Sequence, residues 1–254
     1  MVGPVTSDEL SARRANSFGV HAATYAEHRP DYPAAAIRWS LAPLGEGAHR
    51  VLDLAAGTGK LTGGLVAEGH HVTAVEPDEA MLSELVRHHG GVRALPGTAE
   101  RIPVPDATMD AVVVGQAFHW FNATKALPEI ARVLRPGGIL AGLWNSDDYS
   151  VPWVEEFHRA AGDDRPPKMD GTVDNMPPHP LFRDPETREF PHHQRRTAES
   201  LVATIGTYSY TLVMPRAERE KLLDDLLQFL RTHPETTGEF DVPMVTYAKR
   251  TTRV

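Results

Sequence analysis

Cysteine is absent from the 254-residue sequence, which excludes disulfide bonds, thiolate zinc sites and cysteine nucleophiles. This absence fits a reducing, cytoplasmic setting. Long apolar runs are lacking too. None approaches the roughly 20 residues that span a bilayer, and the polar N-terminal stretch lacks the apolar segment of a signal peptide. We therefore expect a cytoplasmic protein with no membrane partner.

Positive charge is also scarce. Lysine and arginine number 26 against 34 aspartates and glutamates, which gives a formal net charge of -8. Because no basic stripe offsets this excess, we expect no nucleic acid partner. The sequence contains 13 histidines, but the paired ones lack carboxylates at the spacing of metal ligands, so no metal site is expected. These pairs are His70 with His71, His88 with His89, and His192 with His193.

From residue 50 to 145, short β-branched stretches alternate with stretches of helical periodicity. The pattern predicts strands at 50–55, 71–77, 92–98, 109–117 and 139–145, and helices at 61–69, 78–91 and 123–138, the last stopped by Pro-Gly-Gly. Strands at 186–194 and 240–251 and helices at 198–211 and 216–233 are predicted beyond them. This alternation predicts right-handed crossovers and an α/β fold: a Rossmann-like, doubly wound, mostly parallel sheet of seven strands with helices on both faces.

No repeat or clear boundary divides the chain, so we expect residues 1–254 to form a single domain around a cofactor-binding core at 50–145. Residues 162–180 interrupt the regular pattern with prolines, glycine and charges, which is typical of a loop. The length of this loop suits either a lid over the site or a surface insertion with no catalytic role. Ligands of such sheets bind beyond the carboxyl ends of the strands, so the residues that follow each strand are the candidates for a site.

The stretch VLDLAAGTGKLT, residues 51–62, runs from the first predicted strand into glycines and has the form of a cofactor loop. It does not fit a phosphate loop of the Walker type, because leucine follows its Gly-Lys pair where serine or threonine is required. It also departs from the dinucleotide fingerprint, which needs a third glycine at the position of Thr62. The carboxylate of Asp53 discriminates further, since at the mouth of the turn it would repel a pyrophosphate and attract a cation.

S-adenosylmethionine fits that charge, because it carries a sulfonium and an ammonium group and no phosphate. Gly57 and Gly59 lack the Cβ atoms that would keep the backbone amides away from its carboxylate or ribose. Glu76 follows the second predicted strand, where an acidic side chain can accept both hydroxyls of an adenosine ribose. The alternative role for Glu76 is that of a residue at the start of the next helix, before Pro77.

The sequence resembles the class I S-adenosylmethionine-dependent methyltransferases, and within them the type 11 small-molecule branch. The resemblance covers residues 50–145 and is carried, in order, by VLDLAAGTGKLT, VTAVEPDEAML, LPGTAERIPVPDATMDAVVVGQAFHWF and IARVLRPGGILA. The stretch FGVHAATYAEHRPDYP, within residues 8–45, resembles the family's N-terminal helix and access segment. The C-terminal part of the chain matches only loosely.

The resemblance implies S-adenosylmethionine as cofactor and S-adenosylhomocysteine as product. In the family this cofactor would be held at its methionyl end by the glycine loop, at its ribose by the acidic residue after the second strand, and at its adenine by the residues after the third. Met81 would pack on the adenine, although an ordinary core position suits it equally. The implied cofactor-binding residues are Asp53, Ala55, Gly57, Gly59, Glu76, Pro77, Met81, Thr98, Ala99, Glu100 and Gln116, with Tyr25 and Arg29 from the N-terminal segment.

Methyl transfer needs a nucleophile in line with the departing sulfur, and only an acceptor that must lose a proton needs a general base. The stretch GQAFHWF, residues 115–121, leaves the fourth predicted strand where the acceptor should lie. His119 is the candidate catalytic residue there, either as a base or as a group that orients an oxyanion. The alternative is a histidine packed among aromatic side chains. The predicted substrate pocket comprises Phe118, His119, Trp120 and Trp144.

The FHWF stretch resembles small-acid carboxyl methyltransferases related to trans-aconitate methyltransferase. We therefore predict that a monomer or homodimer O-methylates a carboxylate or hydroxyl of a small molecule. One alternative is a C- or N-methyltransferase of a secondary metabolite or quinone. A second is a protein that binds the cofactor without transferring methyl, and a lower-ranked third is an NAD(P)-dependent oxidoreductase.

Overall fold

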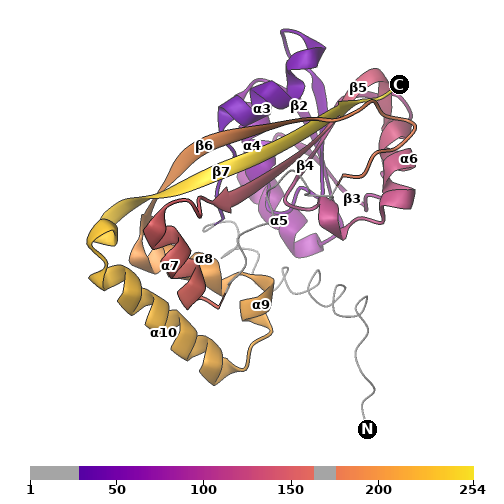
Figure 1. The fold of residues 1–254 in the computed structure, drawn as a ribbon. Coiled ribbons are helices and arrows are strands. Elements are labelled where there is room, and N and C mark those ends of the chain that lie inside the picture. The colour runs from indigo at the N-terminus through magenta and orange to yellow at the C-terminus, as the bar shows by residue number, and fades with distance from the viewer. Residues whose placement is uncertain (1–28, 163–175) are drawn as a thin grey trace.

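The computed structural model describes residues 29–162 and 176–254, whose centre is one sheet in the order β3-β2-β1-β4-β5-β7-β6 (Figure 1). The strands are β1 (Arg50–Leu54), β2 (His71–Glu76), β3 (Arg93–Pro96), β4 (Met109–Gly115), β5 (Leu134–Asp147), β6 (Glu186–Thr197) and β7 (Glu239–Thr252). The first five strands pair in parallel, and β7 runs antiparallel to both β5 and β6. The predicted seven-stranded, mostly parallel sheet is confirmed.

Helices separate the strands, as the alternating pattern predicts, except between β3 and β4. They are α3 (Ala34–Leu41), α4 (Lys60–Ala67), α5 (Glu79–His88), α6 (Ala123–Val133), α7 (Pro152–Ala160), α8 (Ala198–Gly206), α9 (Ser209–Leu212) and α10 (Arg216–Thr232), with short 3-10 turns η2 (Ala42–Leu44), η3 (Phe118–Trp120) and η4 (Pro234–Thr236). The predicted cap of α5 is present, since Asp78 accepts hydrogen bonds from the backbone N–H groups of Ala80 and Met81. Across residues 29–162 and 176–254, no helix has the length and apolar character to cross a membrane.

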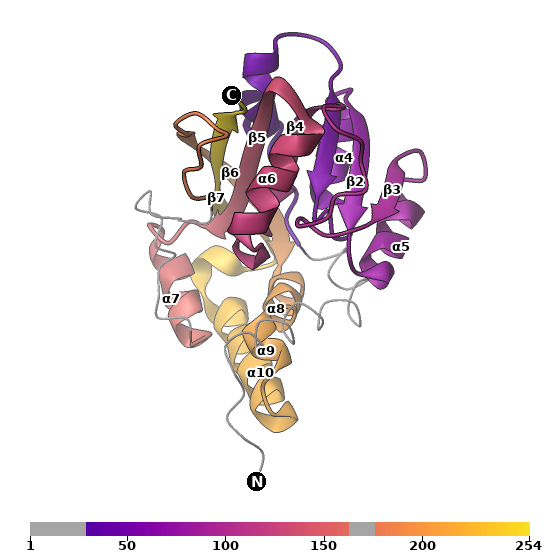
Figure 2. The same cartoon turned by 90° about the vertical axis from the view of Figure 1, so that its right-hand side faces the viewer.

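The central sheet is buried on both faces, as parallel sheets usually are. On one face, apolar side chains of β1, β2, β4 and β5 meet α6, which lies in front of the sheet in Figure 2. On the other face, α3 and α4 cover β1, β4 and β5. Helix α5 adds a smaller apolar cluster against β2. Because β1, β4 and β5 run parallel under these helices, their carboxyl ends lie on the same side of the sheet.

Strands β5, β6 and β7 continue beyond the rest of the sheet as a ribbon that reaches a helical lobe of α7, α8, α9 and α10 (Figures 1 and 2). The lobe has an apolar core of its own, in which α7, α8 and α10 pack against β7. Trp153 and Phe157 of α7 and Phe240 of β7 belong to this core. Because β5 ends at the lobe, the lobe lies on the side of the sheet where its parallel strands end.

Two predicted helices end five residues earlier than their patterns indicate. Helix α6 stops at Val133, because the next residue pairs with Met109 in the sheet and the residue before Pro136 disfavours helical backbone. The predicted helix at 198–211 divides into α8 and α9 at Thr207, whose hydroxyl donates to the carbonyl of Thr204. Helix α7 has no counterpart among the predicted elements.

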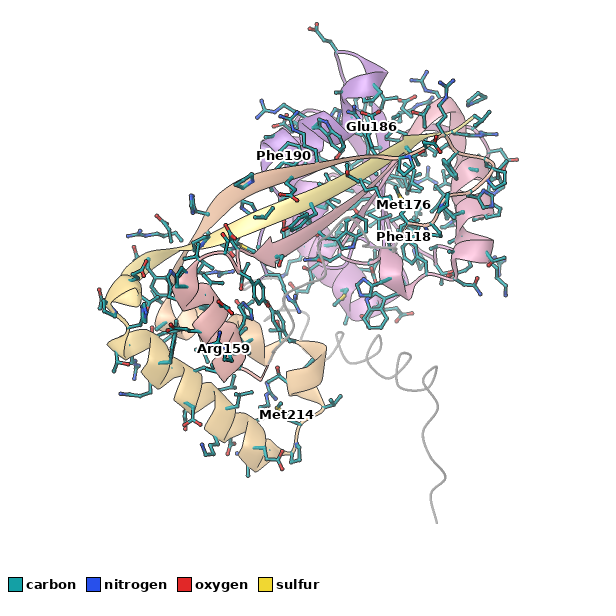
Figure 3. The ribbon with its side chains drawn as sticks, viewed as in Figure 1. Phe118, Arg159, Met176, Glu186, Phe190 and Met214 are labelled. Carbon is teal, nitrogen blue, oxygen red and sulfur yellow. The ribbon has the colours of Figure 1, made fainter. Side chains whose placement is uncertain are left out.

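The candidate lid at 162–180 lies mostly outside the described residues. Its described end is anchored in the core beside α6, where Met176 is buried. Figure 3 shows Met176 close to Phe118, which belongs to the same apolar cluster. The Nζ of Lys249 donates to the carbonyl of Met176 at 2.9 Å. A lid over the site remains a prediction for residues 163–175.

Gly142 of β5 provides a test of this packing. A Cβ atom added there would overlap the indole of Trp144, which is buried in the core beside α6. We expect Gly142→Ala to lower the free energy of unfolding by about 2 kcal/mol, because overpacked cores lose about 1–3 kcal/mol. Urea unfolding measures this loss. Gly91→Ala is the control, since its added Cβ meets nothing within 4 Å. Equal losses in the two variants would contradict the packing.

Candidate functional site

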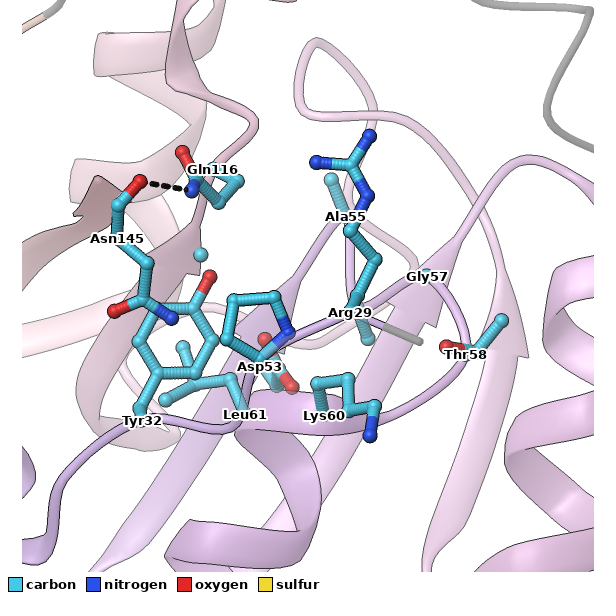
Figure 4. Close-up of a pocket in the computed structure, with 13 residues that line it drawn as sticks. Arg29, Tyr32, Asp53, Ala55, Gly57, Thr58, Lys60, Leu61, Gln116 and Asn145 are labelled. Carbon is cyan, nitrogen blue, oxygen red and sulfur yellow. Dashed lines mark hydrogen bonds between the residues drawn. The ribbon is translucent and has the colours of Figure 1, made fainter. Parts of the chain in front are cut away.

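An open pocket of about 500 Å3, solvent at its mouth included, lies at the carboxyl ends of β1 and β4 (Figure 4). Three parts of the chain form it: the segment before α3, the loop after β1, and the ends of β4 and β5. Its lining residues are Arg29, Pro30, Tyr32, Asp53, Ala55, Ala56, Gly57, Thr58, Lys60, Leu61, Gly115, Gln116 and Asn145. This is the edge at which open parallel sheets bind their ligands.

The loop between β1 and α4 turns through three residues of left-handed backbone. These are Ala55, Gly57 and Gly59, with φ of 57°, 58° and 90°. Gly59 also has no room for a side chain, because a Cβ there would stand 2.7 Å from the ring of His89. Ala55 carries a Cβ in a conformation that costs such residues about 1–2 kcal/mol. Strain of this kind persists where the surrounding structure holds it, as at ligand sites.

Asp53, the fourth residue of β1, is fully buried at the base of the pocket. Its Oδ2 accepts a hydrogen bond from the hydroxyl of Thr62 at 2.5 Å, while its Oδ1 has no partner in the described chain. Burial raises the pKa of Asp53 to about 7; the carboxylate of Glu76 adds to this rise and the hydrogen bond from Thr62 opposes it. The pocket therefore contains a carboxylate oxygen that lacks a donor or a cation.

Glu76 ends β2 and is also buried. Its Oε2 accepts a hydrogen bond from the backbone N–H of Gly57 at 2.8 Å, and its Oε1 accepts one from that of Asp78 at 3.0 Å. Burial raises its pKa, and these two hydrogen bonds oppose the rise. Glu76 thus ties the glycine loop to the start of α5. Each of its oxygens has a further lone pair, so the predicted contact with a ribose remains a prediction.

The residues predicted to surround adenine do not line the described pocket. Met81 is buried, and its sulfur is 3.9 Å from where a Cβ of Gly57 would stand. Ala99 packs in the core beside α6, and Glu100 accepts a hydrogen bond from the backbone N–H of Asn122. Pro77 and Thr98 likewise lie outside this pocket. Of the predicted cofactor residues, the described pocket brings together Arg29, Asp53, Ala55, Gly57 and Gln116, whereas Gly59 and Glu76 do not line it.

Gln116 and Asn145 close the pocket on the side of β4 and β5. Gln116 has left-handed backbone, with φ of 56°, and its amide donates to the carbonyl of Asn145 at 2.7 Å (Figure 4). The hydroxyl of Tyr32 lies against Gly115, in space that any larger residue there would take. Tyr32, Lys60 and Asn145 line the pocket but are absent from the predicted site. The rule that ligands bind after strand ends could have identified Asn145.

Arg29 lines the pocket as predicted, and its guanidinium lies 4.5 Å from the centre of the Tyr208 ring. Its Nη2 donates to the carbonyl of Thr207 at 3.4 Å, so it connects the pocket to the helical lobe. Tyr25, the other predicted residue of the N-terminal segment, lies outside the described residues. Within residues 29–162 and 176–254, no cluster of three or more potential metal ligands is present.

The predicted substrate residues do not line the described pocket either. His119 and Trp120 are exposed on η3, with their ring centres 4.7 Å apart. Phe118 and Trp144 are buried in the core beside α6. The structure therefore gives Phe118 and Trp144 packing contacts, and the catalytic role of His119 remains a prediction.

Comparison with known proteins identifies similar chains. The methyltransferase domain family matches residues 52–142. An uncharacterized methyltransferase of Mycobacterium tuberculosis is 40% identical over 238 residues, which are 93% of this chain and 95% of that protein. A solved structure assigned to the type II methyltransferases, from Anaeromyxobacter dehalogenans, has a TM-score of 0.67 and 26% identity over 89% of this chain and 97% of its own.

Two partial relatives differ in what they methylate. A ubiquinone/menaquinone biosynthesis C-methyltransferase of Rubrivivax gelatinosus is 31% identical over 62% of each chain. A malonyl-[acyl-carrier protein] O-methyltransferase of Methylococcus capsulatus is 39% identical over 39% of this chain and 38% of that protein. Similarity over part of the chain therefore accompanies both carbon and oxygen acceptors.

Asp53 should make the stability of the protein depend on pH. Its pKa is about 7 in the folded chain against an ordinary 3.8, so folding favours the protonated form in the window between these values. Stability therefore falls as pH rises through that window, by up to about 1.4 kcal/mol per pH unit. We expect Asp53→Asn to remove this loss. Thermal unfolding measured between about pH 5 and pH 8 should show the midpoint of the variant rising relative to that of the wild type.

Asp224→Asn is the control for this experiment, because Asp224 is exposed on α10. Its midpoint should follow that of the wild type at every pH. A difference between Asp53→Asn and the wild type that does not change with pH would contradict a raised pKa for Asp53.

Proposed function

The chain belongs to the class I S-adenosylmethionine-dependent methyltransferases, and from this membership we propose that it transfers a methyl group to a carboxylate or hydroxyl oxygen of a small molecule. The family establishes the class of enzyme, whereas the acceptor is the proposed part. The observation that carries the assignment of the site is the buried Oδ1 of Asp53, which has no partner in the described chain and lies in a pocket beside a left-handed glycine turn.

The residues of the pocket fit the family's cofactor. Asp53 would face its cationic methionyl end, and the closely approachable amides of the turn at Gly57 would face its carboxylate or ribose. Arg29 supplies a positive charge at the rim of the same pocket. When bound, S-adenosylmethionine supplies a methyl group made electrophilic by its sulfonium. A nicotinamide dinucleotide fits poorly, because its pyrophosphate would meet the carboxylate of Asp53.

The lining of the described pocket bears on the acceptor. Apart from Asp53, which is assigned to the cofactor, it includes Tyr32, Lys60 and Asn145 but no histidine. A carboxylate is already ionised at neutral pH and needs positioning rather than a base, so this lining favours a carboxylate over a hydroxyl. The resemblance of the FHWF stretch to small-acid carboxyl methyltransferases supports the same acceptor. Carbon methylation remains the alternative, with the partial quinone C-methyltransferase relative in its favour.

The cofactor roles of Asp53 and Glu76 can be tested by isothermal titration with S-adenosylhomocysteine. We expect Asp53→Ala and Glu76→Ala each to weaken binding at least tenfold, about 1.4 kcal/mol, because the first removes the buried charge and the second frees the glycine loop. Asp224→Asn, on the exposed face of α10, should bind as the wild type does. Unchanged affinities would remove the assigned roles. Tight binding of NADH with no response to S-adenosylhomocysteine would instead indicate a different cofactor.

The role of His119 needs a separate measurement. If its imidazole accepts a proton or orients the acceptor, His119→Ala should lower the rate of methyl transfer at least tenfold while the affinity for S-adenosylhomocysteine stays within twofold. Transfer of labelled methyl from S-adenosylmethionine into a metabolite extract gives the rate. A fully active variant would restrict His119 to its contact with Trp120 on the exposed η3 turn.

A further inference from the structure

The end of helix α5 packs against the glycine loop through Leu85 and His89. His89 directly follows the helix, and its backbone N–H donates to the carbonyl of Leu85 at 2.8 Å. A Cβ atom on Gly59 would stand 2.7 Å from Cδ2 of the His89 ring and 3.0 Å from Cγ of Leu85, which is closer than real Cβ atoms approach other atoms. The missing side chain of Gly59 therefore makes room for His89, in addition to allowing the left-handed turn.

A second glycine receives the same ring. Gly63 lies in α4 four residues after Gly59, the N-cap of that helix, so the two residues share one face. A Cβ atom on Gly63 would stand 2.9 Å from Cε1 and 3.3 Å from Nε2 of His89. Glycine inside a helix is less favourable than alanine, so its presence calls for a reason. The outer edge of the His89 ring supplies one, because it occupies a notch formed by the two glycines, which we call the glycine notch.

The glycine notch adjoins the pocket wall without being part of it. Gly59, Gly63 and His89 do not line the described pocket, whereas Thr58 and Lys60, the chain neighbours of Gly59, both line it. Because residues 58–60 are consecutive, a movement of Gly59 toward α5 would displace both wall residues. The ring of His89 occupies the space into which Gly59 would move.

The His89 ring enters the notch without a charge. Its side chain is half-buried, and burial lowers the pKa of its imidazole. The charges of His88 and Lys60 act in the same direction, while the backbone of Gly59 and the charge of Asp31 oppose the shift. Asp31 and Lys60 also pair with each other at 3.2 Å. An imidazole whose pKa lies below its ordinary value is neutral at pH 7.

We propose that His89 is a positioning residue for the cofactor: its ring, seated between Gly59 and Gly63, holds the glycine loop in the conformation that binds S-adenosylmethionine. His89 does not line the pocket, so it acts through the loop residues Thr58 and Lys60. This inference rests on the proposed methyltransferase function.

The physical reason is preorganisation of the loop. Glycine has the most permissive backbone of all residues, and the loop contains two glycines in left-handed conformation, Gly57 and Gly59. Glu76 holds the first through its backbone N–H, and His89 closes the space behind the second. Without the ring, part of the binding free energy would be spent in ordering the loop. Loss of the ring should therefore weaken cofactor binding while the protein still folds, because the ring is half-buried at a helix end.

Isothermal titration with S-adenosylhomocysteine measures this effect. We expect His89→Ala to weaken binding by about fivefold or more. His89→Gln should stay within about twofold of the wild type, because its neutral planar amide reaches as far as Nε2 of the ring. His88→Ala is the matched control, since His88 is exposed and its Nδ1 lies 2.9 Å from the carbonyl oxygen of Glu84. Its affinity should also stay within about twofold.

Gly63→Ala tests the notch from the other side. The added methyl group would occupy the place of the His89 ring and push the ring out, so we expect binding to weaken by about fivefold. In the His89→Ala background the same substitution has no ring to displace, and it should change the affinity by less than about twofold. The double variant should remain folded, because alanine favours a helix more than glycine does.

Thermal unfolding identifies variants that fail to fold. If His89→Ala shows no cooperative transition, Gly63→Ala is compared instead with Gly91→Ala, whose added Cβ meets nothing within 4 Å. Gly91→Ala should bind as the wild type does, and Gly63→Ala should bind about fivefold more weakly. Equal affinities in these two variants would contradict the role of His89.

Three further results overturn the proposal. The first is wild-type affinity in His89→Ala, or an equal loss in His88→Ala. The second is an equal loss in His89→Gln and His89→Ala, because a neutral planar group of the same reach should hold the loop. The third is an effect of Gly63→Ala that is the same with and without the ring. A wild type that does not bind S-adenosylhomocysteine counts instead against the proposed function.

Discussion

The burial of one carboxylate is the constraint on which the site depends. Asp53 is placed by β1 where water does not reach it, and the single hydroxyl of Thr62 satisfies only one of its oxygens. A buried charge of this kind is costly unless a cation or a donor meets it. The loop that follows is shaped to let a ligand approach closely, at the cost of left-handed backbone at Ala55. The site thus gives up stability that a bound cationic group can restore.

The sequence predicts those parts of the fold in which local pattern and tertiary packing agree. β1, β2 and β4 are short apolar stretches between helices, so periodicity locates them, and the charge of Asp53 selects the cofactor class. What periodicity misses depends on contacts between distant residues. Helix α7 is buried because it packs against β7. Tyr32 lines the pocket because its side chain packs against Gly115. His119 follows a strand end as a site residue would, yet the turn that carries it leaves it exposed.

The part of the chain that holds the cofactor pocket is common to methyltransferases with different acceptors. The matched methyltransferase domain covers β1 to β5, and partial relatives with carbon and oxygen acceptors resemble this chain over part of its length. Strand β6 and the helical lobe lie beyond this domain, although the Mycobacterium tuberculosis relative is similar over 93% of the chain. The sequence motifs lie mostly within this matched domain, and they therefore lead to the cofactor class and say little about the acceptor.

The ribbon of β5, β7 and β6 has a consequence for how this protein can change. Residues 191 to 196 of β6 alternate between an inner and an outer face, and Arg195 and Arg196 lie on opposite faces. Inserting or deleting one residue in β6 would exchange the two sets and expose every polar group that now faces inward. Substitutions can therefore alter the inner face gradually, whereas length changes in this strand would abolish it in one step. Changes in the ribbon should therefore accumulate as substitutions within its strands and as insertions only in the loops that join them.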